Sequence, residues 1–338
     1  MITTGRRFEE GPSAPAVGIL GTGSCLPSYV VTNDEVGAPA GVDDAWIFGK
    51  TGIRNRRWAK PDEATSDLAI AAGRAALEAA GIRGSELSLI ITATSTPDSP
   101  QPATAALVAE GLGAGSGTPA FDLNAVCSGF NFALTTAERI IRGTGGYALV
   151  VGADIYSRIL DPRDRRTTIL FGDGAGAVVL GPSRGRTVIS ARLAGFSDDH
   201  ELIRVPAGGS RLPATEDTLR DGLHYFTMNG RAVRDFVADN VAPAISAFLA
   251  DNGVAPADIA HFVPHQANGR MIDDLADRIG IPRDRTRSTY EEYGNTGSAS
   301  VPVTLDHAVR TADMKDGDLV LLAAFGGGMA MGLVLLQW

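Results

Sequence analysis

Apolar residues in this chain follow two patterns, short continuous runs and longer segments with helical spacing. A short apolar run bounded by polar or Gly-containing turns is typical of a buried strand. Strands are therefore predicted at Val17–Leu20, Leu89–Ala93, Tyr147–Val151 and Ala175–Leu180. Ser66–Ala80 has helical spacing, with Ser66 as the predicted N-cap and Gly81 just past the end. This alternation of strands and helices predicts an α/β protein.

The same pattern occurs twice along the chain. In the first half, a helical segment ends at Gly81 and leads through Leu87 into the strand after it. In the second half, a helical segment ends at Gly253 and leads through Ile259 into a strand that ends at His265. Two pseudo-symmetric α/β halves are the simplest account. The predicted organisation is a flexible N-terminal tail at 1–14, a first half at 15–183 and a second half at 184–338.

The longest irregular stretch, residues 197–223, is rich in Gly, Pro and charged residues. A long loop of that kind in a compact domain usually forms a lid or a wall of a site. A solvated insertion explains the same composition, and both interpretations stay open.

The composition narrows the class of protein. The 338 residues suffice for two core-bearing units, and 44% apolar with 20% charged residues is ordinary for a soluble globular enzyme. A formal net charge of −9 argues against nucleic acid or a membrane surface as a partner, but allows a local basic entrance for a phosphorylated ligand. The chain has two cysteines and no apolar run of membrane-spanning length. We therefore expect no disulfide framework, no metal site and a cytoplasmic location.

Three polar residues carry the candidate chemistry. Cys127 lies where an apolar strand gives way to a helical pattern, and the N–H groups and dipole of a helix N-terminus predict a lowered thiol pKa there. His265 ends the second-half counterpart of the strand that ends at Ala93, and Asn295 follows in a Gly-Asn-Thr-Gly turn. The pattern predicts a nucleophile with two polar partners at the seam between the halves.

Each of these residues also has an ordinary structural explanation. A small buried cysteine is usually inert, and a histidine near a strand end is often only a hydrogen-bonded core residue. Asparagine tolerates the left-handed backbone angles of turns. Their joint occurrence at matched places in two repeated halves favours a catalytic set.

Five motifs together resemble those of β-ketoacyl-ACP synthase III, a condensing enzyme of the thiolase superfamily, over roughly residues 15–338. They are the Cys127 segment Asp122–Phe130, Gly172–Ala177, His265–Asn268, Gly294–Gly297 and Phe325–Gly328. The resemblance implies a thiolase-like fold, in which two pseudo-symmetric α/β halves form a layered αβαβα core.

The resemblance implies a decarboxylative Claisen condensation. Cys127 would take the acyl group of an acyl-CoA starter, and the N–H groups of Cys127 and Gly327 would hold the thioester oxyanion. His265 and Asn295 would donate to the carbonyl of a malonyl thioester and stabilise the enolate left when carbon dioxide departs. The product is a β-ketoacyl thioester that primes fatty acid, polyketide or other secondary-metabolite synthesis. No cofactor is implied, since the CoA thioester is a substrate.

The resemblance also assigns residues around this centre. Phe130 and Phe325 would shield the site. Gln101 would reach across a homodimer interface and close the acyl pocket, and being smaller or more polar than the usual Phe it would admit a longer or more polar starter than acetyl. Trp46 would stack on adenine, although a plain core role competes with this interpretation. The residues expected to bind CoA are Trp46, Lys50 in place of the usual Arg, Arg165, Ala267 and Asn268.

A further segment would meet an acyl carrier protein. It comprises Gln266, Ala267, Asn268, Gly269 and Arg270. In relatives the helix that follows carries basic residues, but here Asp273, Asp274 and Asp277 bring negative charge. This predicts either a plain solvated acidic face or a preference for a specialised carrier or a CoA thioester. The extender is thus open between malonyl-ACP and malonyl-CoA.

Other functions remain to be weighed. An acyltransferase of the same fold could pass the Cys127-bound acyl group to a hydroxyl or amine. The presence of Asn295 argues against this function, because acyl transfer needs a base but no decarboxylation site. A non-catalytic scaffold subunit does not need all three residues. A papain-like protease also uses Cys, His and Asn, but does not fit the α/β alternation.

Overall fold

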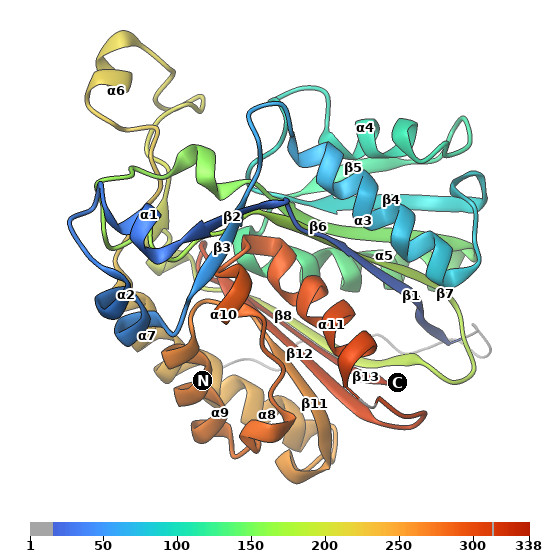
Figure 1. Cartoon of the computed structure of the whole chain (residues 1–338). Coiled ribbons are helices and arrows are strands. Elements are labelled where there is room, and N and C mark those ends of the chain that lie inside the picture. The colour runs from blue at the N-terminus through green and yellow to red at the C-terminus, as the bar shows by residue number, and fades with distance from the viewer. Residues whose placement is uncertain (1–15, 313) are drawn as a thin grey trace.

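The computed structural model describes residues 16–312 and 314–338, so the tail predicted at 1–14 lies outside the described residues. Two sheets lie in its interior (Figure 1). The five-stranded sheet has the order β1-β7-β6-β4-β5, and the four-stranded sheet has the order β11-β12-β13-β8. The strands of the first are β1 (Val17–Cys25), β4 (Leu87–Ala93), β5 (Ala120–Leu123), β6 (Tyr147–Asp154) and β7 (Gly174–Pro182). Those of the second are β8 (Thr187–Gly195), β11 (Ile259–Pro264), β12 (Leu319–Gly326) and β13 (Ala330–Gln337).

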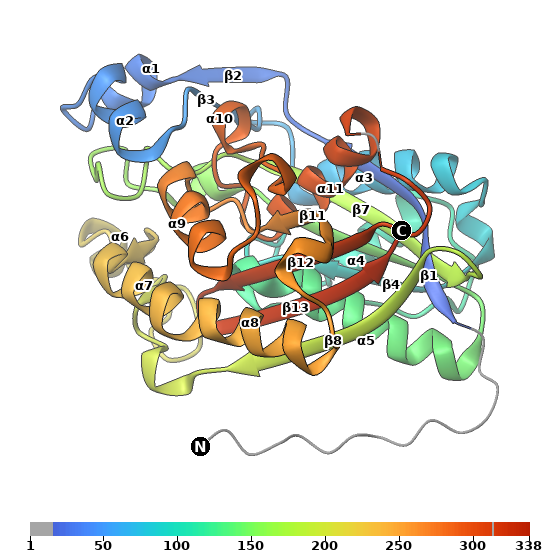
Figure 2. The same ribbon diagram turned by 90° about the horizontal axis from the view of Figure 1, so that it is seen from below.

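Helices fill three layers around these sheets. Helices α5 (Gly129–Thr144) and α11 (Ser300–Thr311) lie between the sheets and contact both of them. Helix α3 (Thr65–Ala80) covers the outer face of the first sheet, and α8 (Ala242–Asp251) with α9 (Gly269–Ile279) covers the outer face of the second (Figures 1 and 2). The result is the layered αβαβα core of the thiolase-like fold.

Smaller elements complete the chain, and most of them gather at one edge of the layers (Figure 1). The helices are α1 (Asn33–Gly37), α2 (Asp44–Thr51), α4 (Thr104–Gly111), α6 (Glu216–Arg220), α7 (Gly230–Phe236) and α10 (Tyr290–Tyr293). The strands are β2 (Tyr29–Thr32), β3 (Asn55–Trp58), β9 (Ile203–Arg204) and β10 (Thr227–Met228). The boundary predicted at 183/184 falls between β7 of one sheet and β8 of the other, and the division into domains stays a prediction.

The close approach of α11 to the first sheet depends on a glycine. A Cβ at Gly176 in β7 would lie 2.6 Å from the backbone nitrogen of Val303 in α11. No side chain larger than hydrogen fits that gap without moving the helix. The chain enters α11 from the Asn295 turn through a 3-10 turn at Gly297–Ala299, so α11 lies on the same side of the sheet as that turn.

The helix predicted at Ser66–Ala80 ends as expected but begins differently. Gly81 has the left-handed φ of +67° that caps α3. Ser66 is not the N-cap, because α3 begins at Thr65 and the Ala64 N–H is bonded instead by the Asp67 carboxylate at 2.8 Å. The Ser66 hydroxyl donates to Asp98, 32 residues away, at 2.6 Å. A long-range partner therefore removes Ser66 from the local capping role.

The irregular stretch at 197–223 combines both roles that were left open for it. Its first part forms β9, which pairs with β10 and brings Ile203 to the wall of a buried cavity. Its later part carries α6, which stands away from the layered core in Figure 1. The stretch therefore forms part of the cavity wall at Ile203 and a solvated insertion around α6.

Candidate active site

Cys127 sits on a sharp turn between β5 and α5. The turn is a single 3-10 turn over Val126–Ser128, and Val126 in it has a φ of +49°. It is the one non-glycine residue with a positive φ in the described ranges, and a β-branched side chain rarely adopts that conformation. The turn leaves Cys127 at the N-terminal end of α5, buried to 5% exposure.

Gly326, at the end of β12, lies directly against this turn. A Cβ there would be 2.7 Å from Cβ of Cys127 and 3.0 Å from its backbone nitrogen. Gly327 is buried next to the side chains of Val126 and Ile203. The Phe-Gly-Gly-Gly segment therefore packs directly against the Cys127 turn. The role of the Gly327 N–H as second oxyanion donor stays a prediction.

Replacing Gly326 with alanine is expected to lower the rate of acyl loading by at least about 100-fold, because the added methyl displaces Cys127 by more than a catalytic geometry tolerates. The mass added to Cys127 after mixing with acyl-CoA measures the rate. Gly143→Ala is the matched control, since a Cβ there meets nothing within 4 Å. Equal loading by the Gly326→Ala variant and the control would contradict this account of the site.

One cavity of about 180 Å³ brings the three candidate residues together. Cys127, His265 and Asn295 all line it, as do Ala267 and Asn268 from the segment before α9. The Phe325 ring lies edge-on to the His265 ring, with centroids 5.3 Å apart. Residues from both halves of the chain therefore converge on one space, as the sequence predicted for this seam.

A serine on α11 holds the ring of His265. Nδ1 of His265 lies 2.7 Å from Oγ of Ser300, which also accepts from the Gln266 N–H at 3.4 Å. In the tautomer in which the Ser300 hydroxyl donates to Nδ1, the ring hydrogen lies on Nε2. Burial lowers the pKa of His265 to about 3, so the ring is neutral at working pH. His265 is built as a neutral hydrogen-bond donor.

This depressed pKa makes stability depend on pH. The unfolded chain protonates His265 near pH 6.5 and the folded chain only near 3, so the stabilisation is full above pH 6.5 and is lost as the pH falls toward 3. From pH 7 to pH 5 we expect His265 to account for a loss of about 2 kcal/mol in the free energy of unfolding. Urea titrations of wild type and His265→Gln at both pH values measure the difference. An unchanged acid sensitivity in the variant would contradict this expectation.

The hydrogen bonds of Asn295 use its amide oxygen and leave its NH₂ group to donate into the cavity. Its Oδ1 accepts from the Gly297 N–H at 3.0 Å, and its backbone bonds to Leu170 and Gly172 on the first half. Asparagine has no charge to titrate, so this group donates at any pH. Asn295 and His265 thus offer two neutral donors to the same cavity.

The lowered thiol pKa that was predicted for Cys127 is wrong for this resting structure. Burial, followed by the nearby charge of Asp154, raises the pKa of Cys127 to about 12. Hydrogen bonds from Tyr156 and from the residue's own backbone act in the opposite direction but are outweighed. The neutral His265 brings no positive charge, so desolvation wins over the helix terminus.

The residues predicted for CoA fall into separate places. Trp46 is half-buried, and the guanidinium of Arg165 lies 5.6 Å from the centre of its ring, in a hollow of about 400 Å³ at α2. Lys50 instead lines a hollow of about 370 Å³ with Asn268 and Arg270. Asn268 lines both this second hollow and the catalytic cavity, so it lies between the surface and Cys127.

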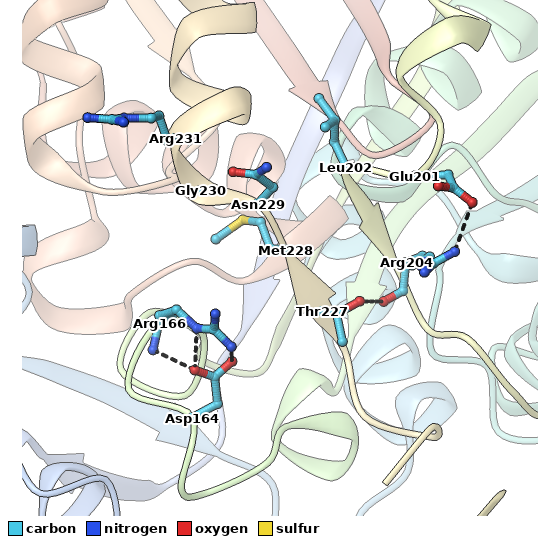
Figure 3. Close-up of a pocket in the computed structure, with 10 residues that line it drawn as sticks. All are labelled: Asp164, Arg166, Glu201, Leu202, Arg204, Thr227, Met228, Asn229, Gly230 and Arg231. Atoms are coloured by element: carbon cyan, nitrogen blue, oxygen red, sulfur yellow. Dashed lines mark hydrogen bonds and ion pairs between the residues drawn. The ribbon is translucent and has the colours of Figure 1, made fainter. Parts of the chain in front are cut away.

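A third hollow of about 630 Å³ adjoins the catalytic cavity and was not foreseen from the sequence (Figure 3). Arg166, Met228 and Gly230 line both spaces. Arg166 pairs with Asp164 at 2.8 Å, and Arg204 in the same hollow pairs with Glu201 at 3.0 Å (Figure 3). Two of the three guanidinium groups that line it, those of Arg166 and Arg204, are therefore neutralised within the chain.

Several predicted residues are not where the resemblance put them. Phe130 is fully buried in the core between the sheets and does not line the cavity. Gln266 and Gly269 cannot meet a carrier protein, because Gln266 is fully buried with its amide bonded to backbone and Gly269 is buried against Tyr290. Gln101, in contrast, is exposed and lies outside the cavity of its own chain, which agrees with a role across a dimer interface, and that role stays a prediction.

Other residues of the cavity wall were missed by sequence reasoning. They are Arg166, Leu170, Phe171, Ile203, Phe226, Met228, Gly230, Val233, Met271 and Gly326. The signal for Phe171 was its place before the Gly-Asp-Gly-Ala motif, but nothing local marks Phe226. Within residues 16–312 and 314–338, no cluster of three or more His, Cys, Asp or Glu could hold a metal ion. In the same ranges no helix is long and apolar enough to cross a membrane.

Comparison with known proteins matches two parts of this chain to one protein family. Residues 121–195 match the family model described as 3-oxoacyl-[acyl-carrier-protein (ACP)] synthase III, and residues 249–338 match the model of its C-terminal part. The matched ranges contain Cys127, His265 and Asn295.

Individual relatives cover almost the whole chain. An acetoacetyl CoA synthase of Streptomyces sp. (strain CL190) is 58% identical over 95% of this chain and 98% of its own length. A beta-ketoacyl-[acyl-carrier-protein] synthase III of Symbiobacterium thermophilum is 43% identical over 95% and 98%. The crystal structure of the priming beta-ketosynthase from the R1128 polyketide biosynthetic pathway is 34% identical, covers 97% of this chain and 98% of its own, and superposes with a TM-score of 0.88.

Proposed function

The chain belongs to the 3-oxoacyl-[acyl-carrier-protein] synthase III family, and from that premise we propose that it joins acetyl-CoA to malonyl-CoA, releasing acetoacetyl-CoA, CoA and carbon dioxide. The general activity is a decarboxylative Claisen condensation of an acyl-CoA starter with a malonyl thioester, the reaction that primes fatty acid and polyketide chains. The observation that carries the proposal is the single cavity lined by Cys127, His265 and Asn295.

In the first step Cys127 becomes acylated. Its sulfur attacks the carbonyl carbon of the starter thioester, the bond to the CoA sulfur breaks, and the thiol hydrogen leaves with CoA as its thiol. The charge on the carbonyl oxygen would be held by the N–H groups of Cys127 and Gly327, donors that need no reorganisation in a dry site. CoA would reach Cys127 past Asn268, with its nucleotide between Trp46 and Arg165 and phosphate near Lys50.

In the second step the malonyl thioester loses carbon dioxide. The Nε2–H of His265 and the NH₂ of Asn295 would donate to its thioester carbonyl, and the electrons of the breaking C–C bond collect as an enolate on that oxygen. The enolate carbon then attacks the acyl group on Cys127 and releases the sulfur. The ring of Phe325 beside His265 offers the departing carboxylate no hydrogen bond, which favours its loss as neutral carbon dioxide.

The charge distribution on α9 supports a CoA-bound extender. Arg278 pairs with Asp274 at 2.8 Å, and Arg283 pairs with Asp277 at 2.7 Å and with Asp273 at 3.5 Å. An acidic carrier protein approaching this helix would meet carboxylates and already neutralised guanidinium groups, which disfavours docking. Arg270 is exposed and unmatched by a carboxylate among the described ion pairs, which suits a single phosphate better than a protein surface.

A two-carbon starter fits the size of the cavity. About 180 Å³ is small for a ligand site, and it must also take the end of a pantetheine arm. Acetoacetyl-CoA, for which the Streptomyces relative is named, is the product of an acetyl starter and a CoA-bound extender. The expectation of a longer starter depended on Gln101, which does not line the cavity of its own chain.

The test is a comparison of extenders and starters on the purified enzyme. We expect kcat/KM with malonyl-CoA to exceed that with malonyl-ACP by at least about 10-fold, and acetyl-CoA to load Cys127 faster than longer acyl-CoAs. The variant Asp273→Asn/Asp277→Asn, whose carboxylates do not line the hollow at Lys50, should raise the use of malonyl-ACP while leaving malonyl-CoA unchanged. A carrier-bound extender that proved the better substrate, or a longer starter that loaded faster, would overturn the corresponding half of the proposal.

The site is less suited to the alternative, transfer of the acyl group to a hydroxyl or amine. That reaction needs a base, and a histidine with a pKa of about 3 is a weak one. Release of one carbon dioxide per product distinguishes the two activities.

We also propose that two copies form a homodimer through β5. This strand is at the edge of the five-stranded sheet, where its outer backbone groups are free to pair with another strand. Phe121 in it is one of the exposed large apolar side chains of the molecule. Light scattering should give twice the mass of one chain, and Phe121→Asp should halve it.

A further inference from the structure

Arg56 in β3 carries a buried charge that only neutral groups hold in the part of the chain that the structure describes. Its exposed fraction is 0%. It donates to three uncharged oxygens, the carbonyl of Val31 at 3.4 Å, Oδ1 of Asn33 at 2.8 Å and the carbonyl of Ile169 at 2.8 Å, while its Nε has no partner. A buried charge without a carboxylate costs folding free energy, so stability alone does not account for this arginine.

One arm of the guanidinium binds the segment that holds Asn295. Nη2 of Arg56 donates to the carbonyl that begins segment 169–172. In that segment the Leu170 carbonyl accepts from the Asn295 N–H at 2.8 Å, and the Gly172 N–H donates to the Asn295 carbonyl at 3.0 Å. Leu170 also lines the catalytic cavity. A single carbonyl therefore separates Arg56 from the backbone bonds that place Asn295.

The other arm is fastened to α2. Nη1 of Arg56 donates to Oδ1 of Asn33, and Nδ2 of Asn33 donates to Oδ1 of Asp44 at 2.8 Å and to the Ile53 carbonyl at 2.7 Å. Asp44 is the first residue of α2, the helix that carries Trp46. Asn33 is itself buried to 1% exposure, so water does not compete for these bonds. The guanidinium thus connects α2 to the wall of the catalytic cavity.

The stem of Arg56 packs directly on the turn that contains Asn295. A Cβ added to Gly294, the residue before Asn295, would lie 3.4 Å from Cβ of Arg56, and one added to Gly172 would lie 3.1 Å from it. Strand β3 also runs beside α10, the helix that leads into this turn (Figures 1 and 2). Both the stem and the charged end of Arg56 therefore contact the surroundings of Asn295.

We propose that Arg56 is a positioning residue for decarboxylation, which holds segment 169–172, and through it the donor Asn295, at a fixed place relative to α2. Arg56 does not line the catalytic cavity, so it acts through Asn295 and not on the substrate. A donor displaced by about 1 Å from its productive place can lower a rate about 100-fold. The inference rests on the proposed role of Asn295 in stabilising the enolate.

The test begins with Arg56→Lys, which keeps the charge but cannot reach the acceptors on both sides with one ammonium group. We expect carbon dioxide release from malonyl-CoA by the acetylated enzyme to fall about 10- to 100-fold, while acyl loading of Cys127 stays within about threefold of wild type. In an Asn295→Ala background the same substitution should lower carbon dioxide release by less than about threefold, because the group that Arg56 positions is gone. A residue that only stabilised the fold would lower both stages and act equally in both backgrounds.

The matched control is Arg57→Lys, the same substitution one position along β3. Its side chain makes no hydrogen bond to segment 169–172 among the bonds of the described residues, and its guanidinium lies 5.9 Å from the centre of the Tyr293 ring. This variant should load and decarboxylate at the wild-type rate. A loss of carbon dioxide release equal to that of Arg56→Lys would overturn the inference.

A crystal structure of Arg56→Lys makes the test independent of activity. We expect the Asn295 side chain to move by about 1 Å while Cys127 and His265 stay in place. An unmoved Asn295 overturns the inference even if Asn295 proves dispensable for carbon dioxide release, so the two proposals can fail separately. If Arg56→Lys does not fold, Arg56→Gln, which leaves no buried charge, is measured in its place. Failure of both variants to fold also overturns the inference, since Arg56 would then serve stability.

Discussion

Replacement of Asn295 by aspartate is expected to lower the rate of condensation by about 1,000-fold or more while leaving acyl loading of Cys127 within about threefold of wild type. The new carboxylate can only accept hydrogen bonds, and its charge opposes the enolate that forms beside it. The backbone bonds of residue 295 to Leu170 and Gly172 and the bond from the Gly297 N–H do not require the NH₂ group. The variant should therefore fold and take up the acyl group on Cys127, but fail in the decarboxylation of the malonyl thioester.

The measurement is made in two stages on the same sample. Intact mass follows the acetyl group added by acetyl-CoA, and trapped labelled carbon dioxide follows the subsequent reaction with malonyl-CoA. Asn229→Asp is the matched control, because Asn229 caps α7 close to the site without lining the catalytic cavity. Equal losses in loading and in carbon dioxide release would mean that Asn295 holds the site together instead of serving decarboxylation.

Replacement of Cys127 by alanine should abolish acyl loading and reduce formation of the β-ketoacyl thioester by at least about 10⁴-fold. No other group in the cavity can hold the starter, since His265 and Asn295 are arranged as hydrogen-bond donors. The cavity itself is kept, because removing one sulfur atom disturbs neither His265 nor Asn295. Any residual carbon dioxide from malonyl-CoA should appear without a condensed product.

The chain carries its own control for this variant. Cys25, the other cysteine, is half-buried in β1 and lies outside the catalytic cavity. Cys25→Ala should load and condense at the wild-type rate. Acyl mass on the Cys127→Ala protein that disappears in the double variant would show that the starter is held elsewhere.

The strands were predictable because buried strands with helices on both faces need apolar residues at every position. Leu89–Ala93 and Tyr147–Val151 belong to β4 and β6 in the interior of their sheet, so a continuous apolar run was enough to find them. Gly81 was predictable for another local reason, since few residues other than glycine adopt a φ of +67° at a helix end.

The errors arose where distant parts of the chain decide the outcome. Ser66 has the chemistry of an N-cap, but Asp98 binds it. Gln266 stands in a motif read as surface, but its amide bonds to the backbone around Thr289 in the folded chain. The pKa of Cys127 was predicted from the helix that follows it, and the burial that raises it comes from both halves of the molecule. No local pattern contains these partners.

The left-handed Val126 has a consequence for attempts to make this enzyme more heat-resistant. A β-branched residue held at a positive φ costs about 1–3 kcal/mol of folding free energy, so Val126→Gly or Val126→Asn would look attractive in a search for stabilising changes. The same angle aims the neighbouring sulfur, and a backbone relieved of it has more conformations to explore. Selection for thermal tolerance alone would therefore tend to discard the turn on which turnover depends, and a screen that also scores acyl loading would tend to keep it.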